Sequence, residues 1–233
     1  MKPRWLVPVA LTCACAVPAF AGVYRTTTIL LEGDWALGFE PGRVDRLPLL
    51  VHVIGSALFY LLSALQVLPG FRARHPVWHR RAGMVAVIAG LAGATSSIWL
   101  TALHPEISGP ILRYGRLLFG PLWAVFLVSG VLAVRKRDFK QHRAWMIRAF
   151  AVAMPAGTLI FIVTPFFLVL GELPRVLDES IQSCAWIVHL AVAELLIRRE
   201  RHAGARVHHD RTRGTGKGSG RQPVGSATAT LQG

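Results

Sequence analysis

Hydrophobic residues gather into long runs along the chain, separated by short stretches that contain charge, proline or glycine. A helix needs about 20 mostly apolar residues to cross a lipid bilayer, and six runs come near that length. The predicted helices span residues 5–24, 47–68, 82–103, 115–134, 144–170 and 181–197. None of the runs shows the alternation of polar and apolar positions that is typical of membrane β-barrels. The pattern predicts an all-α fold, a polytopic transmembrane helical bundle of about six helices.

The first run also has features of a cleaved signal peptide. Lys2 and Arg4 precede it, and residues 19–21, Ala-Phe-Ala, fit a signal-peptidase site. The run is nevertheless long enough to span a bilayer, and we favour its retention as a helix. Cleavage of residues 1–21 would leave five helices in the same orientation.

Positive charge is unequally divided among the segments that join the runs. Of the 26 Lys and Arg residues, 19 fall in the N-terminus, the second and fourth loops, and the tail after residue 197. Six fall in the remaining connections, and Arg148 lies inside the fifth run. Because loops rich in Lys and Arg stay on the cytoplasmic side, we predict a multi-pass protein of the cell (inner) membrane with both termini in the cytoplasm.

The composition agrees with a chain whose solvent is the lipid bilayer, since 53% of the residues are hydrophobic and 16% are charged. The net charge of +14 does not indicate nucleic-acid binding, because the basic residues do not interleave with polar and aromatic ones. Residues 198–233 are rich in Arg, Gly, Ser and Thr, and they are predicted to form a disordered basic tail. Anionic lipid headgroups are its expected partners.

The second run carries polar residues along one helical face. His52, Ser56, Phe59, Ser63 and Gln66 follow a spacing that keeps them close to one line on a helix. Such a stripe should face the interior of a bundle, where its donors and acceptors find partners. Two interpretations stay open, a hydrogen-bonded seam between helices and a ligand site.

Histidines are the main candidates for chemistry. His79 and His142 open the third and fifth helices at the inner interface, and each is followed by Arg. His52 lies near the outer boundary, where His104 or His189 could be its partner. Paired neutral imidazoles on facing helices are what a b-type haem needs. Contacts with headgroups and water are the alternative for the inner pair.

The fifth run contains a charge and two prolines. The guanidinium of Arg148 must reach the inner headgroups or meet an anion or a carbonyl within the bundle. Pro155 and Pro165 predict a kink that frees backbone carbonyls around Gly157 and Thr158. Kinked helices can belong to transport pathways, so a small-solute transporter is one alternative function.

Three segments together resemble a known family. They are FKQHRAWMIRAF at residues 139–150, WHRRAG at residues 78–83, and the polar stripe from His52 to Gln66. They are similar to the bacterial membrane proteins called domain of unknown function 2306, over about residues 5–197. The residues that match the family's pattern are His52, Gln66, His79, Arg80, Gly83, His142, Arg143, Trp145, Met146 and Arg148. The resemblance implies a polytopic helical bundle that keeps its first run, and it implies no activity.

The resulting hypothesis is a membrane redox protein that binds haem b or works with a quinone. The candidate cofactor-binding residues are His52, Gln66, His79, His142, Arg148, His104 and His189. His52, His79 and His142 are the candidate ligands of haem iron, and no catalytic residue is assigned. A non-catalytic protein that organises lipids or partner proteins is the other alternative.

Overall fold

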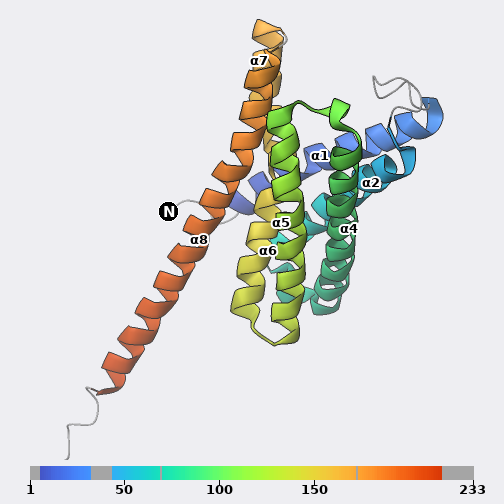
Figure 1. Ribbon diagram of the computed structural model, residues 1–233. Coiled ribbons are helices and arrows are strands. Elements are labelled where there is room, and N and C mark those ends of the chain that lie inside the picture. Colours follow the sequence, from blue (N-terminus) through green and yellow to red (C-terminus); the bar gives the residue numbers. More distant parts are fainter. Residues whose placement is uncertain (1–5, 33–43, 69, 172, 217–233) are drawn as a thin grey trace, which may run out of the picture. The chain divides into compact units, whose positions relative to one another are not determined.

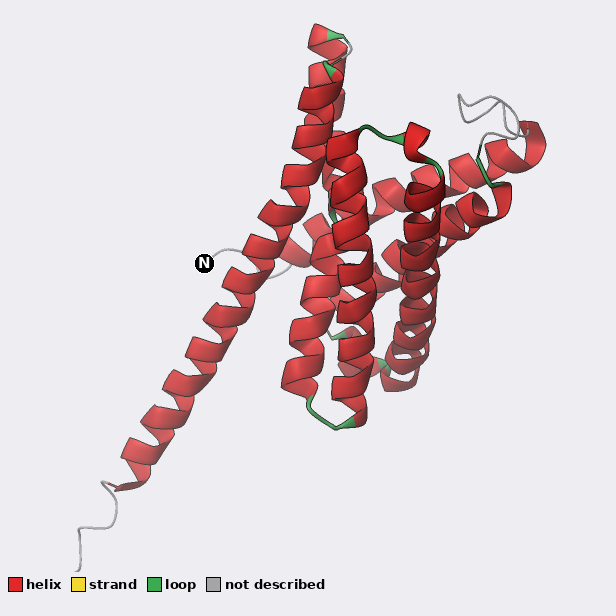
Figure 2. Ribbon diagram, in the orientation of Figure 1, coloured by secondary structure: helices red, strands yellow, loops and turns green. Residues whose placement is uncertain are grey.

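The computed structural model is helical throughout the residues that it describes, which are 6–32, 44–68, 70–171 and 173–216 (Figure 2). The elements in chain order are α1 (Leu6–Glu32), α2 (Arg46–Val67), α3 (Phe71–Arg74), α4 (Pro76–Leu103), η2 (Pro105–Ile107), α5 (Pro110–Arg135), α6 (Phe139–Ala153), α7 (Pro155–Leu170) and α8 (Arg175–Gly216). The all-α fold predicted from the sequence is confirmed. The chain separates into two compact units, Met1–Ala193 and Glu194–Gly233, and all sites described below lie in the first.

Several helices have the length and composition to cross a membrane. Four single helices qualify, namely Arg46–Gln66, Pro76–Leu103, Pro110–Arg135 and Arg175–His202. A bent pair, Phe139–Ala153 with Pro155–Phe161, provides a fifth span if it is counted as one. α1 adds a shorter apolar stretch, Cys15–Leu31. The described residues therefore hold four to five candidate spans, where the sequence predicted about six.

Four helices begin five or six residues before their predicted starts, which were 82, 115, 144 and 181. Proline occupies the first turn of α4 and α5, where its missing N–H costs no hydrogen bond. In α6 the carboxylate of Asp138 accepts a hydrogen bond of 2.9 Å from the backbone N–H of Gln141. Hydropathy locates the lipid-embedded part of a helix, whereas these caps locate its end. His79 and His142 consequently lie within the first turns of α4 and α6.

The last helix continues past its predicted end at Ile197. α8 extends to Gly216. Residues 198–216 include six Arg, which favour helix, and no proline. The disorder predicted for the tail stays a prediction. Residues 217–233 of that tail lie outside the described residues.

Four helices of the first unit, α2, α4, α5 and α6, form a bundle that we call the ring (Figure 1). α2 packs against α4, α4 against α5, and α5 against α6. α2 meets α6 where the Tyr60 hydroxyl donates a hydrogen bond to the Ala153 carbonyl. α1 packs against α2 in addition.

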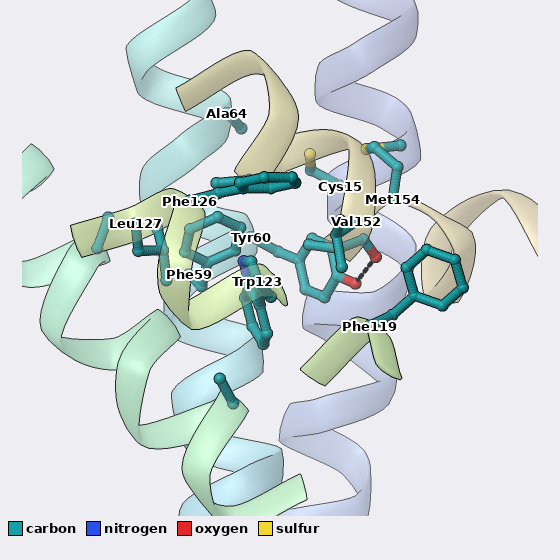
Figure 3. Close-up of a cluster of buried hydrophobic side chains, with 14 of the residues drawn as sticks. Cys15, Phe59, Tyr60, Ala64, Phe119, Trp123, Phe126, Leu127, Val152 and Met154 are labelled. Atoms are coloured by element: carbon teal, nitrogen blue, oxygen red, sulfur yellow. Dashed lines mark hydrogen bonds between the residues drawn. The ribbon is translucent and has the colours of Figure 1, made fainter. Parts of the chain in front are cut away.

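Aromatic side chains fill the middle of this ring (Figure 3). Phe59 meets Trp123 edge to face with ring centroids 5.1 Å apart, and Phe126 packs on Trp145 at 5.6 Å. Leu127 between them is fully buried. Since the middle is packed, a site for a ligand has to lie toward one end of the ring.

α2 and α4 approach each other closely through small residues. A side chain on Gly55 would place its Cβ 2.8 Å from the Ala89 carbonyl oxygen, so the backbones are nearly in contact. One face of α4 carries small residues that are buried here as a packing face. Its buried members are Ala86, Gly90, Ala94 and Thr101.

The predicted kink at Pro155 is confirmed, with a bend of 45° between α6 and α7. The backbone N–H groups of Gly157 and Thr158 both bond to the Met154 carbonyl, at 2.9 and 3.1 Å. The carbonyls left without helical partners belong to the preceding turn, not to residues around Gly157. The indole N–H of Trp186 donates to the Val152 carbonyl at 3.0 Å, and Tyr60 donates to Ala153.

Candidate functional site

Polar side chains gather at both ends of the four-helix ring. We call the end where α4 and α6 begin the inner end, which the sequence predicts to be cytoplasmic, and the end where α2 and α5 begin the outer end. His79 and His142 belong to the inner end. His52 and Arg116 belong to the outer end.

His142 is anchored through one ring nitrogen to the neighbouring helix. Its Nδ1 lies 2.8 Å from the Gly130 carbonyl oxygen of α5. A carbonyl can only accept, so Nδ1 carries the hydrogen and Nε2 of the neutral ring keeps its lone pair. Nε2 has no hydrogen-bond partner within the described residues. Histidines that bind metals commonly hold their second nitrogen in this way.

His79 lies at the same end of the ring as His142. Each is the fourth residue of its helix, and both helices begin at the inner end. His142 is also within electrostatic reach of His79. Nδ1 of His79 is buried and has no partner in the described part of the chain. The structure therefore brings the predicted inner pair to one end of one bundle.

Gln66 reaches the same end from α2. Its Oε1 lies 3.6 Å from the position that a Cβ on Gly83 would take, one turn above His79. Its Nε2 is buried without a partner among the described residues. An unpaired buried polar atom costs about 1–3 kcal/mol, so two of them at one end indicate a place for a polar ligand or water.

Arg148 lies deeper on α6 than His142. Its guanidinium carbon is 4.7 Å from the centroid of the Trp145 ring, a cation–π contact. The aromatic face thus stabilises a half-buried positive charge. A headgroup, an anion or a carbonyl as its partner stays a prediction.

His52 repeats the anchoring of His142 at the outer end. Its Nδ1 lies 3.0 Å from the Gly93 carbonyl oxygen of α4, so Nε2 keeps the lone pair. His52 lines a cavity of about 230 Å³ together with Ser97, Thr101 and Arg116. Sequence reasoning counted Arg116 as a topological charge and missed it as a site residue. Its position inside an apolar run was the available signal.

His104 is engaged in a polar cluster at the outer end of α4. Its Nε2 lies 3.3 Å from Asp45 Oδ2, and its Nδ1 lies 3.2 Å from Glu106 Oε1. The indole of Trp99 also donates to Asp45 at 2.9 Å. This hydrogen bond, followed by that with His104, lowers the pKa of the Asp45 carboxyl from its ordinary value.

His189 connects α8 with α7. Its Nδ1 donates to the Ala185 carbonyl at 2.6 Å, and its Nε2 lies 3.1 Å from Thr158 Oγ1. Both of its ring nitrogens are occupied, as are those of His104. Neither residue lines the cavity beside His52, so the structure does not assemble the predicted outer pair.

A family comparison matches residues 49–197, from the first turn of α2 into α8. The matching profile is described as a predicted membrane protein, DUF2306. The chain belongs to this family. It is accordingly a multi-pass membrane protein whose environment is a lipid bilayer. No curated protein and no solved structure matches the chain.

The DUF2306 segment contains both polar ends of the ring. The candidate residues inside it are His52, Gln66, His79, His104, Arg116, His142, Arg148 and His189. The family resemblance predicted from the sequence is confirmed, and it assigns no activity to any of them.

Proposed function

We propose that this DUF2306 protein binds haem b at the inner end of the ring and transfers single electrons within the membrane. His79 and His142 would hold the haem iron in this proposal. The observation that supports it is that two imidazoles, in the first turns of α4 and α6, lie within electrostatic reach of each other. Helical bundles hold cofactors between facing side chains, and haem iron accepts two axial imidazoles.

The residues at the inner end fit a haem in their donor chemistry. Nε2 of His142 retains its lone pair because Nδ1 is committed to Gly130, and His79 has a buried nitrogen with no described partner. Gly130 leaves room for the Met146 side chain beside His142, since a Cβ there would meet the end of that side chain. Met146 and Gln66 are flexible side chains that can rearrange around a bound group.

A bound haem would supply a one-electron iron couple, with a membrane quinone as the predicted redox partner. The chain's own residues would hold and tune the ligands. Gly130 fixes the tautomer and orientation of His142 and raises its basicity. Arg148, held over Trp145, adds a positive charge on the same helix that favours the haem carboxylates.

The test is the visible absorption spectrum of the full chain, expressed with ample haem and purified in detergent. The unmodified protein should show a Soret band, and His79→Ala and His142→Ala should each lose most of it. His75→Ala is the matched control, because His75 is exposed at the same end and its ring lies against Phe71. It should keep the full band.

Loss of the band through unfolding is separated from loss of a ligand by adding free imidazole to His142→Ala. Imidazole should restore the band if only the ligand is missing. Absence of a Soret band in the unmodified protein would overturn the proposal. The lipid-organising and transport alternatives would then remain as the predictions to test.

A further inference from the structure

The outer cavity lies at the opposite end of the ring from the proposed haem. α2, α4 and α5 all contribute to its wall, and its volume is about 230 Å³. Sites for drug-sized ligands usually measure about 300–1,000 Å³, so this cavity suits a smaller group. Its wall is apolar at Leu49, Leu100 and Ile107 and polar at the four residues considered next.

A positive charge in the cavity wall has no hydrogen-bonded or ion-paired partner among the described residues. Arg116 is only partly exposed, and it forms no hydrogen bond or ion pair with any residue of the described part of the chain. The nearest acid, Glu179, is within its electrostatic reach, but Glu179 bonds Arg175 at 3.0 Å. A half-buried guanidinium at membrane depth is costly without an anion. The cavity therefore favours a negatively charged occupant.

The other polar residues of the wall complete a binding site. His52 is within electrostatic reach of Arg116 and keeps Nε2 available as an acceptor, because Nδ1 donates to Gly93. Ser97 and Thr101 bring hydroxyl groups to the same wall. A guanidinium with neighbouring hydroxyls binds oxyanions, and an imidazole acceptor binds a hydroxyl on the same ligand.

We propose that this cavity binds a small oxyanion, with Arg116 as its charge partner and Ser97, Thr101 and His52 as its hydrogen-bonding groups. The oxyanion can come from solution or from the phosphate of a lipid headgroup. Arg116 lies six residues into α5, about 9 Å along the helix axis, which a headgroup or a dissolved ion can reach from the outer side. This site is independent of the proposed haem.

The test measures the thermal unfolding midpoint of the full chain in dodecyl maltoside, a detergent without phosphate. Inorganic phosphate and short-chain phosphatidylglycerol are added in separate titrations, each against sodium chloride of equal ionic strength. The midpoint should rise with one of them, because a ligand that binds the folded state stabilises it. Losing a charged hydrogen bond in Arg116→Gln should weaken the apparent affinity by about ten-fold or more.

Arg113→Gln is the matched control, since Arg113 is also half-buried, lies one turn earlier on α5, and does not line the cavity. It should respond as the unmodified chain does, and Arg116→Lys should keep part of the response. A response to phosphate that depends on Arg116 identifies a dissolved oxyanion, and one to phosphatidylglycerol alone identifies a headgroup. Equal responses of Arg116→Gln and the unmodified chain to both ligands would overturn the proposal.

Discussion

Each end of the ring contains a histidine that is anchored to a glycine carbonyl of the adjacent helix. His142 donates from Nδ1 to Gly130 at 2.8 Å, and His52 donates from Nδ1 to Gly93 at 3.0 Å. In both cases a glycine carbonyl on the adjacent helix orients the imidazole and leaves Nε2 as an acceptor. The anchoring alone therefore does not distinguish the two ends.

The partner of each anchored histidine makes the difference. His142 is within electrostatic reach of His79 at the inner end. His52 shares a cavity wall with Arg116 at the outer end. A second imidazole makes the inner end suitable for a metal centre, whereas a guanidinium repels cations and attracts anions. One bundle geometry thus supports two binding chemistries.

The largest effect is expected from removing the anchored histidine of the inner end. His142→Ala should abolish most haem absorbance, because it removes a proposed axial ligand. His52→Ala should leave the band at full height, since His52 belongs to the other end of the ring. The measurement is the ratio of Soret to protein absorbance in both purified variants. Equal losses in the two variants would show that the ends do not differ in the way proposed.

A substitution at the α2–α4 contact should affect the outer end through packing. In Gly55→Ala the new Cβ would lie 2.8 Å from the Ala89 carbonyl, and backbone cannot move away cheaply. Overpacking of this kind costs about 1–3 kcal/mol. The thermal unfolding midpoint should therefore fall clearly. Gly83→Ala is the control, because its Cβ would meet Gln66 Oε1 at an ordinary 3.6 Å; an equal loss there would contradict the packing argument.

Sequence patterns predicted most of the helices, because hydrophobic length is a strong constraint in a bilayer. α2 was predicted to within one residue at each end. The starts of α4 and α6 were missed, since Pro76 and Asp138 act through capping and not through hydropathy. Those missed starts affect the proposed haem site, because they place His79 and His142 within the first turns of their helices.

The candidate site was only partly predictable. His52, His79 and His142 could be named from their positions in or beside the apolar runs, because ionisable groups there are uncommon. The occupied nitrogens of His104 and His189 come from tertiary contacts with Asp45 and Thr158 that no local pattern encodes. Arg116 was not recognised as a site residue, because the sequence analysis counted it as a loop charge.

Removing a hydrogen bond at the break between α6 and α7 should cause a moderate loss of stability. In Tyr60→Phe the Ala153 carbonyl loses its donor within a buried environment, which should cost about 1–3 kcal/mol. Trp186→Phe removes the donor to the Val152 carbonyl and should act in the same direction, by less, because that bond is only partly buried. Denaturation in detergent measures both. Unchanged stability in Tyr60→Phe would mean that the freed carbonyl finds another donor.

The smallest expected effect concerns the exposed polar cluster beside the outer cavity. The hydrogen bond from Trp99, and then that with His104, lowers the pKa of Asp45 below its ordinary 3.8 in the folded chain. Because the folded pKa is the lower one, this stabilisation is complete above pH 3.8 and is lost as the pH falls through the folded value. The unmodified chain should thus lose slightly more of its unfolding midpoint below that pH than Asp45→Asn does. Trp99→Phe removes the main cause of the shift, so its pH profile should lie between the two. Identical acid profiles of all three chains would show that this cluster does not stabilise the outer end, which would leave the anchoring of His52 to Gly93 as the contact that orders it.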